Sequence, residues 1–330
     1  MRVAVLVLND VFDSGLAVVL DTLETANSLA QSKPRPSRAT AGKGSAQAPY
    51  EVTVCGLARK VRTHQGFGVP LVRAESRARP DLVIVPALGK KTIPELEQAL
   101  ERRDVRDAAQ LLAGWERSGS RIAGACTATF LLAASGILDG GSATTTWWLS
   151  PLFRERFPSV TLDESRMIVE SRRVVTAGAA LAHVDLALYL VQKQSPSLAH
   201  ATARHLVFDA RPSQATYVMP DHMAHSDELV RRFERWARAH LTSFTLSDAA
   251  QGVGASERTL ERRIQAVLGR SPISYVQDLR VELAIHRLRT TQQSVDEIAE
   301  AVGYGDAATL RTLLRKKTGR GLRELRTPGL

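Results

Sequence analysis

The chain of 330 residues is poor in cysteine and contains no long apolar run. Its two cysteines, Cys55 and Cys126, lie far apart in the sequence, which excludes a disulfide framework and fits a reducing compartment. No stretch of about 18 apolar residues occurs, so we expect no membrane span and no membrane partner. The N-terminus enters the apolar segment 3–8 without a long signal-like core, and a cytoplasmic protein is therefore expected.

A metal-binding pattern is also missing. His222 and His225 are spaced as a metal-binding pair could be, but no cysteine or carboxylate completes the pattern around them. We therefore expect neither a metal ion nor a cofactor.

Positive charge is plentiful. Lys and Arg number 44 against 34 Asp and Glu, which gives a formal net charge of +10. Residues 222–330 hold 18 basic and 13 acidic residues. Four further basic residues lie in the Pro- and Ser-rich stretch 31–49, which contains no acid and which we expect to be a disordered insertion. Outside that stretch, the excess of basic over acidic residues thus lies near the C-terminus, where it would attract a polyanion such as nucleic acid.

Residues 1–208 alternate between strand-like and helix-like patterns. Short apolar runs predict strands at 3–8, 50–56, 81–86, 121–124, 167–170 and 173–176. Apolar residues at helical spacing predict helices at 16–29, 93–100, 105–115, 127–135, 180–192 and 198–208. This alternation predicts an α/β domain with a mostly parallel sheet and helices on both faces.

A change of pattern follows this domain. Residues 209–224 contain Pro212 and Pro220 and are expected to form an interdomain linker. From residue 225 to 330 the pattern is all-helical, beginning with an amphipathic helix at 227–240.

This second part contains an internal repeat with an offset of 49 or 50 residues. The matching pairs are Ala250 and Ala299, Gly254 and Gly303, Leu260 and Leu310, Ile264 and Leu314, and Gly269 and Gly319. In each unit the alanine permits close helix packing, and the first glycine is expected to adopt a left-handed conformation where a helix ends. Ser256 and Asp306 are expected to cap the helices that follow. The repeat therefore predicts two helix-turn-helix units.

The second helix of each unit is expected to expose a polar face. We predict that this face contacts DNA through Arg258, Thr259, Arg262 and Arg263 in the first unit, and through Thr309, Arg311, Thr312, Arg315 and Lys316 in the second. Arginine can bind guanine edges through two hydrogen bonds, and both arginine and lysine pair with phosphates. The alternative is that these charges merely solvate the helix faces, but the matching register of two units favours double-stranded DNA as the partner.

A helix predicted at 273–289 separates the two units, and Pro272 suits its first turn. At 1.5 Å per residue it forms a rigid spacer of about 25 Å. Such a spacer could hold two recognition helices about one DNA turn, roughly 34 Å, apart.

The motifs of this part resemble those of a known family. The segments ASERTLERRI (255–264), GRSPISYVQDLRVELAIHRL (269–288) and SVDEIAEAVGYGDAATLRTLLRKKTG (294–319), with the closing Arg326, resemble the DNA-binding domain of the AraC/XylS family of bacterial transcription regulators. The resemblance implies a sequence-specific transcription regulator that works with RNA polymerase.

One cysteine of the first domain has the setting of a nucleophile. Cys126 follows a predicted strand and opens a helix, as in a nucleophile elbow. A working cysteine nucleophile also needs a base, usually histidine, and the nearby sequence supplies none. Cys126 is therefore a small residue at a tight turn, a ligand contact, or a catalytic or redox-sensing group.

Three segments of the first domain also resemble a known superfamily. They are GACTATFLLAASGILDG (124–140), ATTTWW (143–148) and TAGAALAHVDLALYLV (176–191), and they resemble the DJ-1/PfpI superfamily, which has an amidotransferase-like fold. With the helical domain attached, the whole chain resembles the GlxA-type subgroup of AraC regulators. Thr127 and Thr146 stand where catalytic relatives or many subgroup members carry histidine, which implies no enzyme and no catalytic residue. A cysteine-dependent hydrolase or glyoxalase is the alternative.

The same resemblance implies an effector, because relatives in this subgroup include regulators of arginine and quaternary-amine catabolism. We expect a small cationic or amino-acid-like molecule bound by Asp13, Cys126 and Trp147, since an aromatic ring can face a cation. Asp13 could instead cap the helix that follows it. The domain is also expected to form a homodimer, and a domain that only dimerises is a further alternative.

Overall fold

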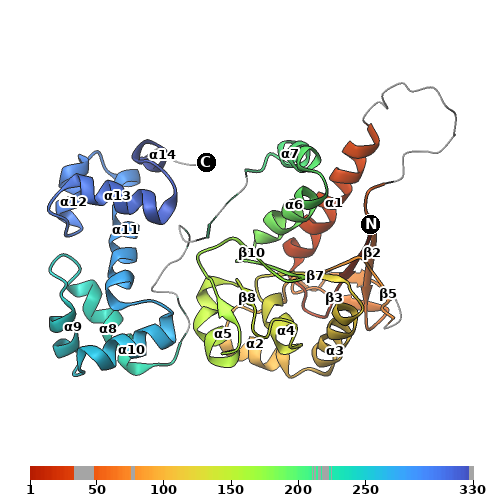
Figure 1. The fold of residues 1–330 in the computed structure, drawn as a ribbon, viewed down its shortest axis with the longest axis horizontal. Helices are drawn as coiled ribbons and strands as arrows, with labels where there is room; N and C mark the ends of the chain where they lie inside the picture. Colours follow the sequence, from red (N-terminus) through yellow and green to blue (C-terminus); the bar gives the residue numbers. More distant parts are fainter. Residues whose placement is uncertain are drawn as a thin grey trace. The chain divides into compact units, whose positions relative to one another are not determined.

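The computed structural model describes residues 1–32, 48–75, 79–209, 211, 213–214, 217, 223 and 225–326. The chain divides into two compact units, which are drawn in Figure 1. One comprises Met1–Trp147 with Phe157–Gln214, and the other Trp148–Arg156 with Ala215–Leu330. Most of the expected insertion at 31–49 and of the expected linker at 209–224 lies outside the described residues. The predicted domain boundaries stay predictions.

A seven-stranded sheet forms the centre of the first unit, in the order β10-β11-β7-β6-β1-β2-β5. Its strands are β1 (Arg2–Leu6), β2 (Glu51–Gly56), β5 (Val72–Arg73), β6 (Leu82–Val85), β7 (Arg121–Ala125), β10 (Ile168–Ser171) and β11 (Val174–Ala177). All neighbours pair in parallel except β10, which runs antiparallel to β11. The predicted mostly parallel sheet is confirmed.

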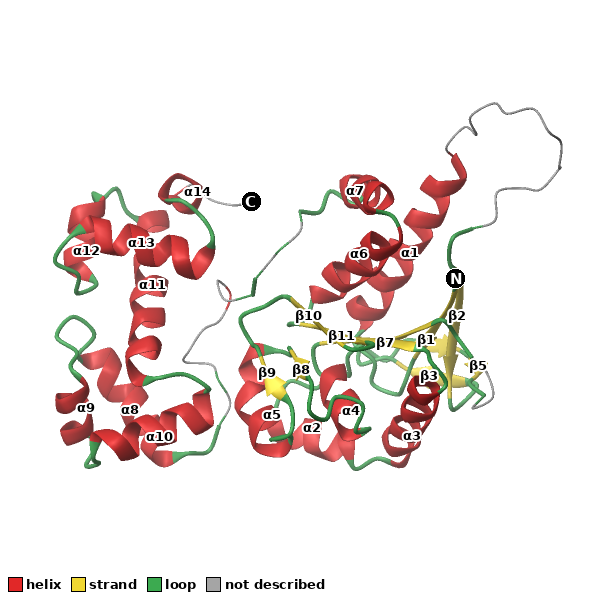
Figure 2. Ribbon diagram, in the orientation of Figure 1, coloured by secondary structure: helices red, strands yellow, loops and turns green. Residues whose placement is uncertain are grey.

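Helices cover both faces of this sheet, as Figures 1 and 2 show. One face carries α1 (Asp13–Ser32), α6 (Ala182–Gln194) and α7 (Pro196–His205), and the other carries α2 (Ile93–Leu100), α3 (Arg103–Arg117) and α4 (Ala128–Ala134). On the first face, β-branched and small strand residues such as Val5 and Ala125 pack against Leu23 and Leu186 in one apolar core. Burial on both faces explains why β6 has the uninterrupted apolar sequence LVIV.

Several short elements were not predicted. They are β3 (Lys60–Arg62), β4 (Gly68–Pro70), β8 (Ser142–Ala143), β9 (Thr161–Leu162), a 3-10 turn at Trp147–Leu149 and α5 (Ser150–Arg156). The strands and the 3-10 turn have two or three residues each, too few to show a hydrophobic period, and α5 has only seven.

The helices of the second unit that follow the linker are α8 (Glu228–Ala239), α9 (Leu246–Gly252), α10 (Glu257–Leu268), α11 (Pro272–Thr290), α12 (Val295–Ala301), α13 (Ala307–Thr318) and α14 (Leu322–Arg326). Pro272 occupies the first turn of α11, as predicted. Leu288, Ile298, Leu310 and Leu314 are buried in the core shared by α11, α12 and α13.

The internal repeat is a structural repeat. α12 has the length of α9 at an offset of 49 residues, and α13 has the length of α10 at an offset of 50. Ser256 and Asp306 accept hydrogen bonds from the backbone N–H groups of Thr259 and Thr309, at 3.2 and 2.8 Å. Gly254 and Gly303 have φ angles of +68° and +85°. The predicted caps and left-handed glycines are therefore confirmed.

Candidate nucleic-acid interface and ligand site

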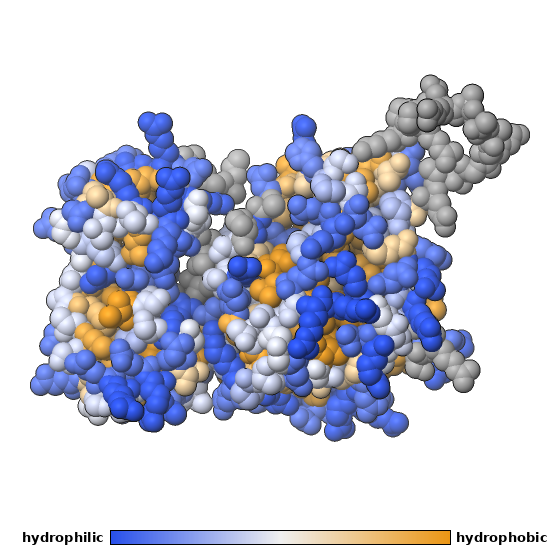
Figure 3. All heavy atoms as spheres, in the orientation of Figure 1, coloured by the Kyte–Doolittle hydropathy of each residue, from blue (hydrophilic) through white to orange (hydrophobic). Residues whose placement is uncertain are grey.

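The predicted DNA-contacting side chains lie on α10 and α13. All of them are exposed except Thr259, which is partly buried. Leu260, Ile264 and Leu268 bury the opposite side of α10, and Leu310 and Leu314 do the same for α13. Figure 3 shows hydrophilic side chains gathered over the surface where Figure 1 draws α10. Both helices therefore present polar side chains to solvent.

Ion pairing separates these cations into two groups. Within the described residues, Arg258 and Arg262 on α10, and Arg311, Arg315 and Lys316 on α13, have no acidic partner. Arg263 differs, because its Nε lies 2.6 Å from Oδ2 of Asp227. The unpaired cations are free to meet phosphates or bases, whereas Arg263 already has a carboxylate.

The predicted threonines are engaged locally. The Thr259 hydroxyl accepts from Ser256 at 2.8 Å, and the Thr309 hydroxyl donates to Asp306 at 2.8 Å. The Thr312 hydroxyl donates to the Ala308 carbonyl at 2.9 Å. Each hydroxyl keeps some capacity to hydrogen-bond, but the unpaired cations are the stronger contact candidates.

Two of the predicted ligand residues, Asp13 and Cys126, follow strands whose carboxyl ends lie at one edge of the sheet in the first unit. Asp13 opens α1 after β1, and Cys126 follows β7, with β6 between these two strands. Carboxyl ends of parallel strands share one edge, where open α/β sheets commonly bind ligands. Trp147 is 7% exposed, and its neighbour Thr146 is in contact with the Cys126 thiol.

Cys126 occupies a strained turn, as the predicted elbow requires. Its φ angle is +56°, and its side chain is buried. Burial raises the pKa of the Cys126 thiol, and the contacts from Ala180, Thr127 and Thr146 offset only part of this effect. The thiol is therefore protonated at neutral pH, contrary to the thiolate that a helix N-terminus would favour.

A histidine that the sequence did not predict, His183, contacts Ala180, whose backbone also contacts the Cys126 thiol. His183 Nε2 accepts from the Ala87 N–H at 3.0 Å, so Nδ1 carries the proton and donates to the Ala180 carbonyl. Complete burial lowers the pKa of His183 to about 4, and its ring lies 6.0 Å from that of Phe12. Both ring nitrogens are occupied, so His183 cannot serve Cys126 as a base in this geometry.

A second missed residue is Gln214, which belongs to the predicted linker. Its carboxamide donates to Thr144 Oγ1 and to the Thr145 carbonyl, both at 3.0 Å, and accepts from the Ala179 N–H at 3.0 Å. Gln214 is 1% exposed, and the Thr145 hydroxyl in turn donates to the Cys126 carbonyl. Gln214 in the predicted linker is thus hydrogen-bonded to the loops around Cys126.

Asp13 keeps one unused oxygen. Its Oδ2 accepts from the Gln65 N–H at 3.1 Å, whereas its buried Oδ1 has no hydrogen-bond partner among the residues that the structure describes. Asp13 lies in the first turn of α1, and its carboxylate makes no hydrogen bond to the backbone of that helix. An unsatisfied buried carboxylate oxygen can accept a donor from a ligand.

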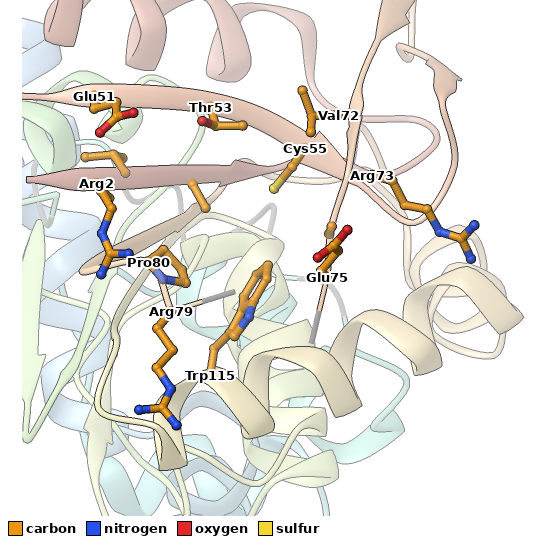
Figure 4. Close-up of a pocket in the computed structure, with 13 residues that line it drawn as sticks. Arg2, Glu51, Thr53, Cys55, Val72, Arg73, Glu75, Arg79, Pro80 and Trp115 are labelled. Carbon is orange, nitrogen blue, oxygen red and sulfur yellow. The ribbon is translucent and has the colours of Figure 1, made fainter. Parts of the chain in front are cut away.

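A separate groove of about 340 Å³ lies on β1, β2 and β5, away from all three predicted ligand residues. Figure 4 shows Cys55 and Trp115 on its walls, with arginine side chains toward its ends. Within the described part of the chain the buried Trp115 Nε1 has no hydrogen-bond partner, and burial raises the pKa of the Cys55 thiol to about 11. No sequence motif predicted this groove, because its walls come from five separate stretches of the chain.

Comparison with known proteins defines the class of each unit. Residues 249–327 match the helix-turn-helix domain family. The fold of this chain resembles that of a ThiJ/PfpI family protein from Pseudomonas syringae, with a TM-score of 0.50 and 16% identity over 77% of this chain and 90% of that protein. The second unit therefore contains an AraC-type helix-turn-helix domain, and the first has the DJ-1/PfpI-like fold.

Two named relatives extend this classification. The chain is 26% identical over 239 residues to the HTH-type transcriptional regulator GbdR of Pseudomonas aeruginosa, covering 69% of this chain and 65% of the relative. It is 25% identical over 201 residues to the HTH-type transcriptional regulator GlxA of Rhizobium meliloti, covering 58% of this chain and 60% of the relative. The matches thus span less than two thirds of these regulators, and the resemblance to GlxA seen in the sequence is confirmed.

Proposed function

We propose that this protein is a DNA-binding transcription regulator that contacts two successive segments of a duplex through α10 and α13. The observation that carries the proposal is the set of five exposed cations on these two helices that lack acidic partners in the described structure. Cations that face solvent on a recognition helix are available to phosphates and to guanine edges. A cytoplasmic location and cooperation with RNA polymerase belong to the same proposal.

The test is selection of bound duplexes from a random-sequence library by the full-length chain. We expect enrichment of a sequence with two conserved segments about one helical turn apart. Binding should weaken steeply as salt rises, because phosphate contacts release counterions. If no sequence is enriched at any salt concentration, the proposal is wrong.

For the first unit we propose an effector site at the sheet edge formed by Asp13, Cys126 and Trp147. The free Oδ1 of Asp13 supports a ligand with a hydrogen-bond donor or a positive charge, such as an amino acid or a quaternary amine. The hydrogen bonds from Gln214 to Thr144 and Thr145 support a route by which ligand binding at this site could change the conformation of the linker.

Thermal-shift measurements with a panel of small cationic and amino-acid-like compounds test this assignment. A stabilising compound should lose its effect in Asp13→Asn and keep it in Arg79→Ala, which alters the separate groove. The opposite result would place the ligand in the groove, and a panel without hits would favour a domain that only forms homodimers.

We also propose that the first unit is not a cysteine enzyme. A protonated, buried Cys126 and a His183 held by two backbone groups leave the nucleophile without an activating base. Native protein should therefore react with iodoacetamide at neutral pH no faster at Cys126 than at the buried Cys55. Rapid, selective labelling of Cys126 would contradict this.

A further inference from the structure

The C-terminal ends of the two recognition helices meet at one carboxylate on α11. Asp278 Oδ2 accepts from Arg270 at 2.6 Å, and Asp278 Oδ1 lies 2.7 Å from Lys317 Nζ. Arg270 directly follows Gly269, which ends α10, and Lys317 belongs to the last turn of α13. Asp278 therefore connects the first helix-turn-helix unit to the second through a single side chain.

The geometry of this triad favours a structural role. The side chains of Arg270, Asp278 and Lys317 are 13%, 21% and 25% exposed, so water screens the two ion pairs less than a surface pair. Lys317 also lies 3.3 Å from the hydroxyl of Ser274, one turn before Asp278. Lys317 and Arg270 are thus held against α11, unlike the unpaired cations on α10 and α13.

A second bridge on α11 lies two residues further along. The Arg280 guanidinium donates to the Leu241 carbonyl at 2.9 and 2.7 Å and lies 5.0 Å from the centre of the Tyr304 ring. Leu241 precedes the first helix-turn-helix unit, and Tyr304 lies in the turn of the second. Arg280 thus joins the turn of the second unit to the segment before the first unit, at a different place from Asp278.

We infer that Asp278 determines which spacing between two DNA segments this protein accepts. The inference rests on the proposed function, and it follows from rigid-body geometry. One added base pair moves the second segment by about 3.4 Å along the axis and turns it around the duplex. A pair of helices held by the triad cannot follow that movement, whereas a pair joined only through apolar packing and Arg280 can adjust.

The experiment uses the full-length chain and a duplex obtained by selection from a random library. The duplex is compared with versions that carry one base pair more or one fewer between the two segments. For the unaltered protein we expect either change to lower affinity about tenfold or more. In Asp278→Asn this penalty should fall below about threefold, because the charge is lost while the side-chain shape is kept.

Two further variants complete the test. Lys317→Met breaks only the link to α13 and should relax the spacing preference in the same way, so it decides the matter if Asp278→Asn does not fold. Glu300→Gln removes an exposed carboxylate on α12 and should keep the tenfold penalty, which controls for reduced repulsion of DNA.

Unchanged spacing profiles in folded Asp278→Asn and Lys317→Met would overturn the inference. A library that yields no enriched duplex would instead refute the proposed function, so the two failures are distinguishable.

Discussion

Arg263 on α10 forms an ion pair with Asp227, its Nε lying 2.6 Å from Oδ2. Asp227 also caps α8 by accepting from the Val230 N–H at 3.0 Å, and its side chain is 7% exposed. Arg263 therefore joins α10 to α8. Its sequence neighbours Arg258 and Arg262, by contrast, have no acidic partner in the described structure.

Arg263 should therefore differ from Arg262 in DNA binding. Affinity for DNA falls as salt rises, and we expect Arg262→Gln to make the slope of log affinity against log salt concentration less steep by about one, as for a lost phosphate or base contact. Arg263→Gln should leave this slope unchanged. Binding isotherms at several salt concentrations measure both slopes.

A double-mutant cycle provides the control. Asp227→Asn keeps the cap of α8 and removes the charge, so it should destabilise the protein by less than about 1 kcal/mol, as should Arg263→Gln. The double variant should be no less stable than either single one. A lowered salt slope in Arg263→Gln would show that Arg263 contacts DNA after all.

Base contact by the unpaired arginines has a separate prediction. Arg262→Ala on α10 and Arg315→Ala on α13 should each cost about 1–3 kcal/mol of DNA affinity and relax the sequence preference at the contacted position. Titrations with the selected duplex and its single-base variants measure both effects. Equal affinity of both variants and the unaltered chain would contradict the assignment of these helices as recognition helices.

The two turn glycines should differ in their tolerance of alanine. A Cβ atom on Gly254 would meet nothing within 4 Å, so Gly254→Ala should cost only the strain of its left-handed backbone, about 1 kcal/mol. A Cβ atom on Gly303 would lie 2.7 Å from the Cα and carbonyl oxygen of Thr242. Gly303→Ala should therefore cost clearly more, and thermal unfolding of both variants checks the order. Equal losses would mean that Thr242 does not pack against this turn in solution.

The buried His183 predicts a pH dependence of stability. The pKa of His183 in the folded chain, about 4, lies below the ordinary value of 6.5. Below pH 6.5 the histidine is therefore protonated in the unfolded chain but stays neutral in the folded chain. Between pH 7.5 and 5 this should remove about 2 kcal/mol from the free energy of unfolding. Urea titrations at both pH values measure the loss, and His183→Gln should lack this component. An identical pH slope in His183→Gln would show that His183 is not buried in its neutral form.

Much of the fold was predictable from local patterns. Helix α2 begins and ends where the apolar spacing placed it, and the strands β6 and β7 differ from their predicted bounds by one residue. The ends of buried parallel strands and capped helices are indicated by residues that are adjacent in the sequence. The hairpin strands β3 and β4 have only three residues each, too few to show a period, and the two-residue strands β8 and β9 pair across about 18 residues of chain, so no local pattern predicted either pair.

The candidate sites divide in the same way. The exposed faces of α10 and α13 followed from helical periodicity, and the setting of Cys126 followed from its strand-turn-helix pattern. The only sequence feature that pointed to His183 was the position of a histidine in a mostly apolar helical segment. Gln214 gave none, because its partners lie about 35 to 70 residues away in the sequence.

By itself, the order of residues determined that this protein has a parallel α/β unit and a twice-used helix-turn-helix plan, because caps, glycines and apolar periods act over a few neighbouring positions. Tertiary structure alone decided which cations are unpaired, which turn glycine is crowded and which carboxylate joins the two recognition helices. Those properties depend on partners such as Asp227, Thr242 and Asp278, which folding brings from remote parts of the chain.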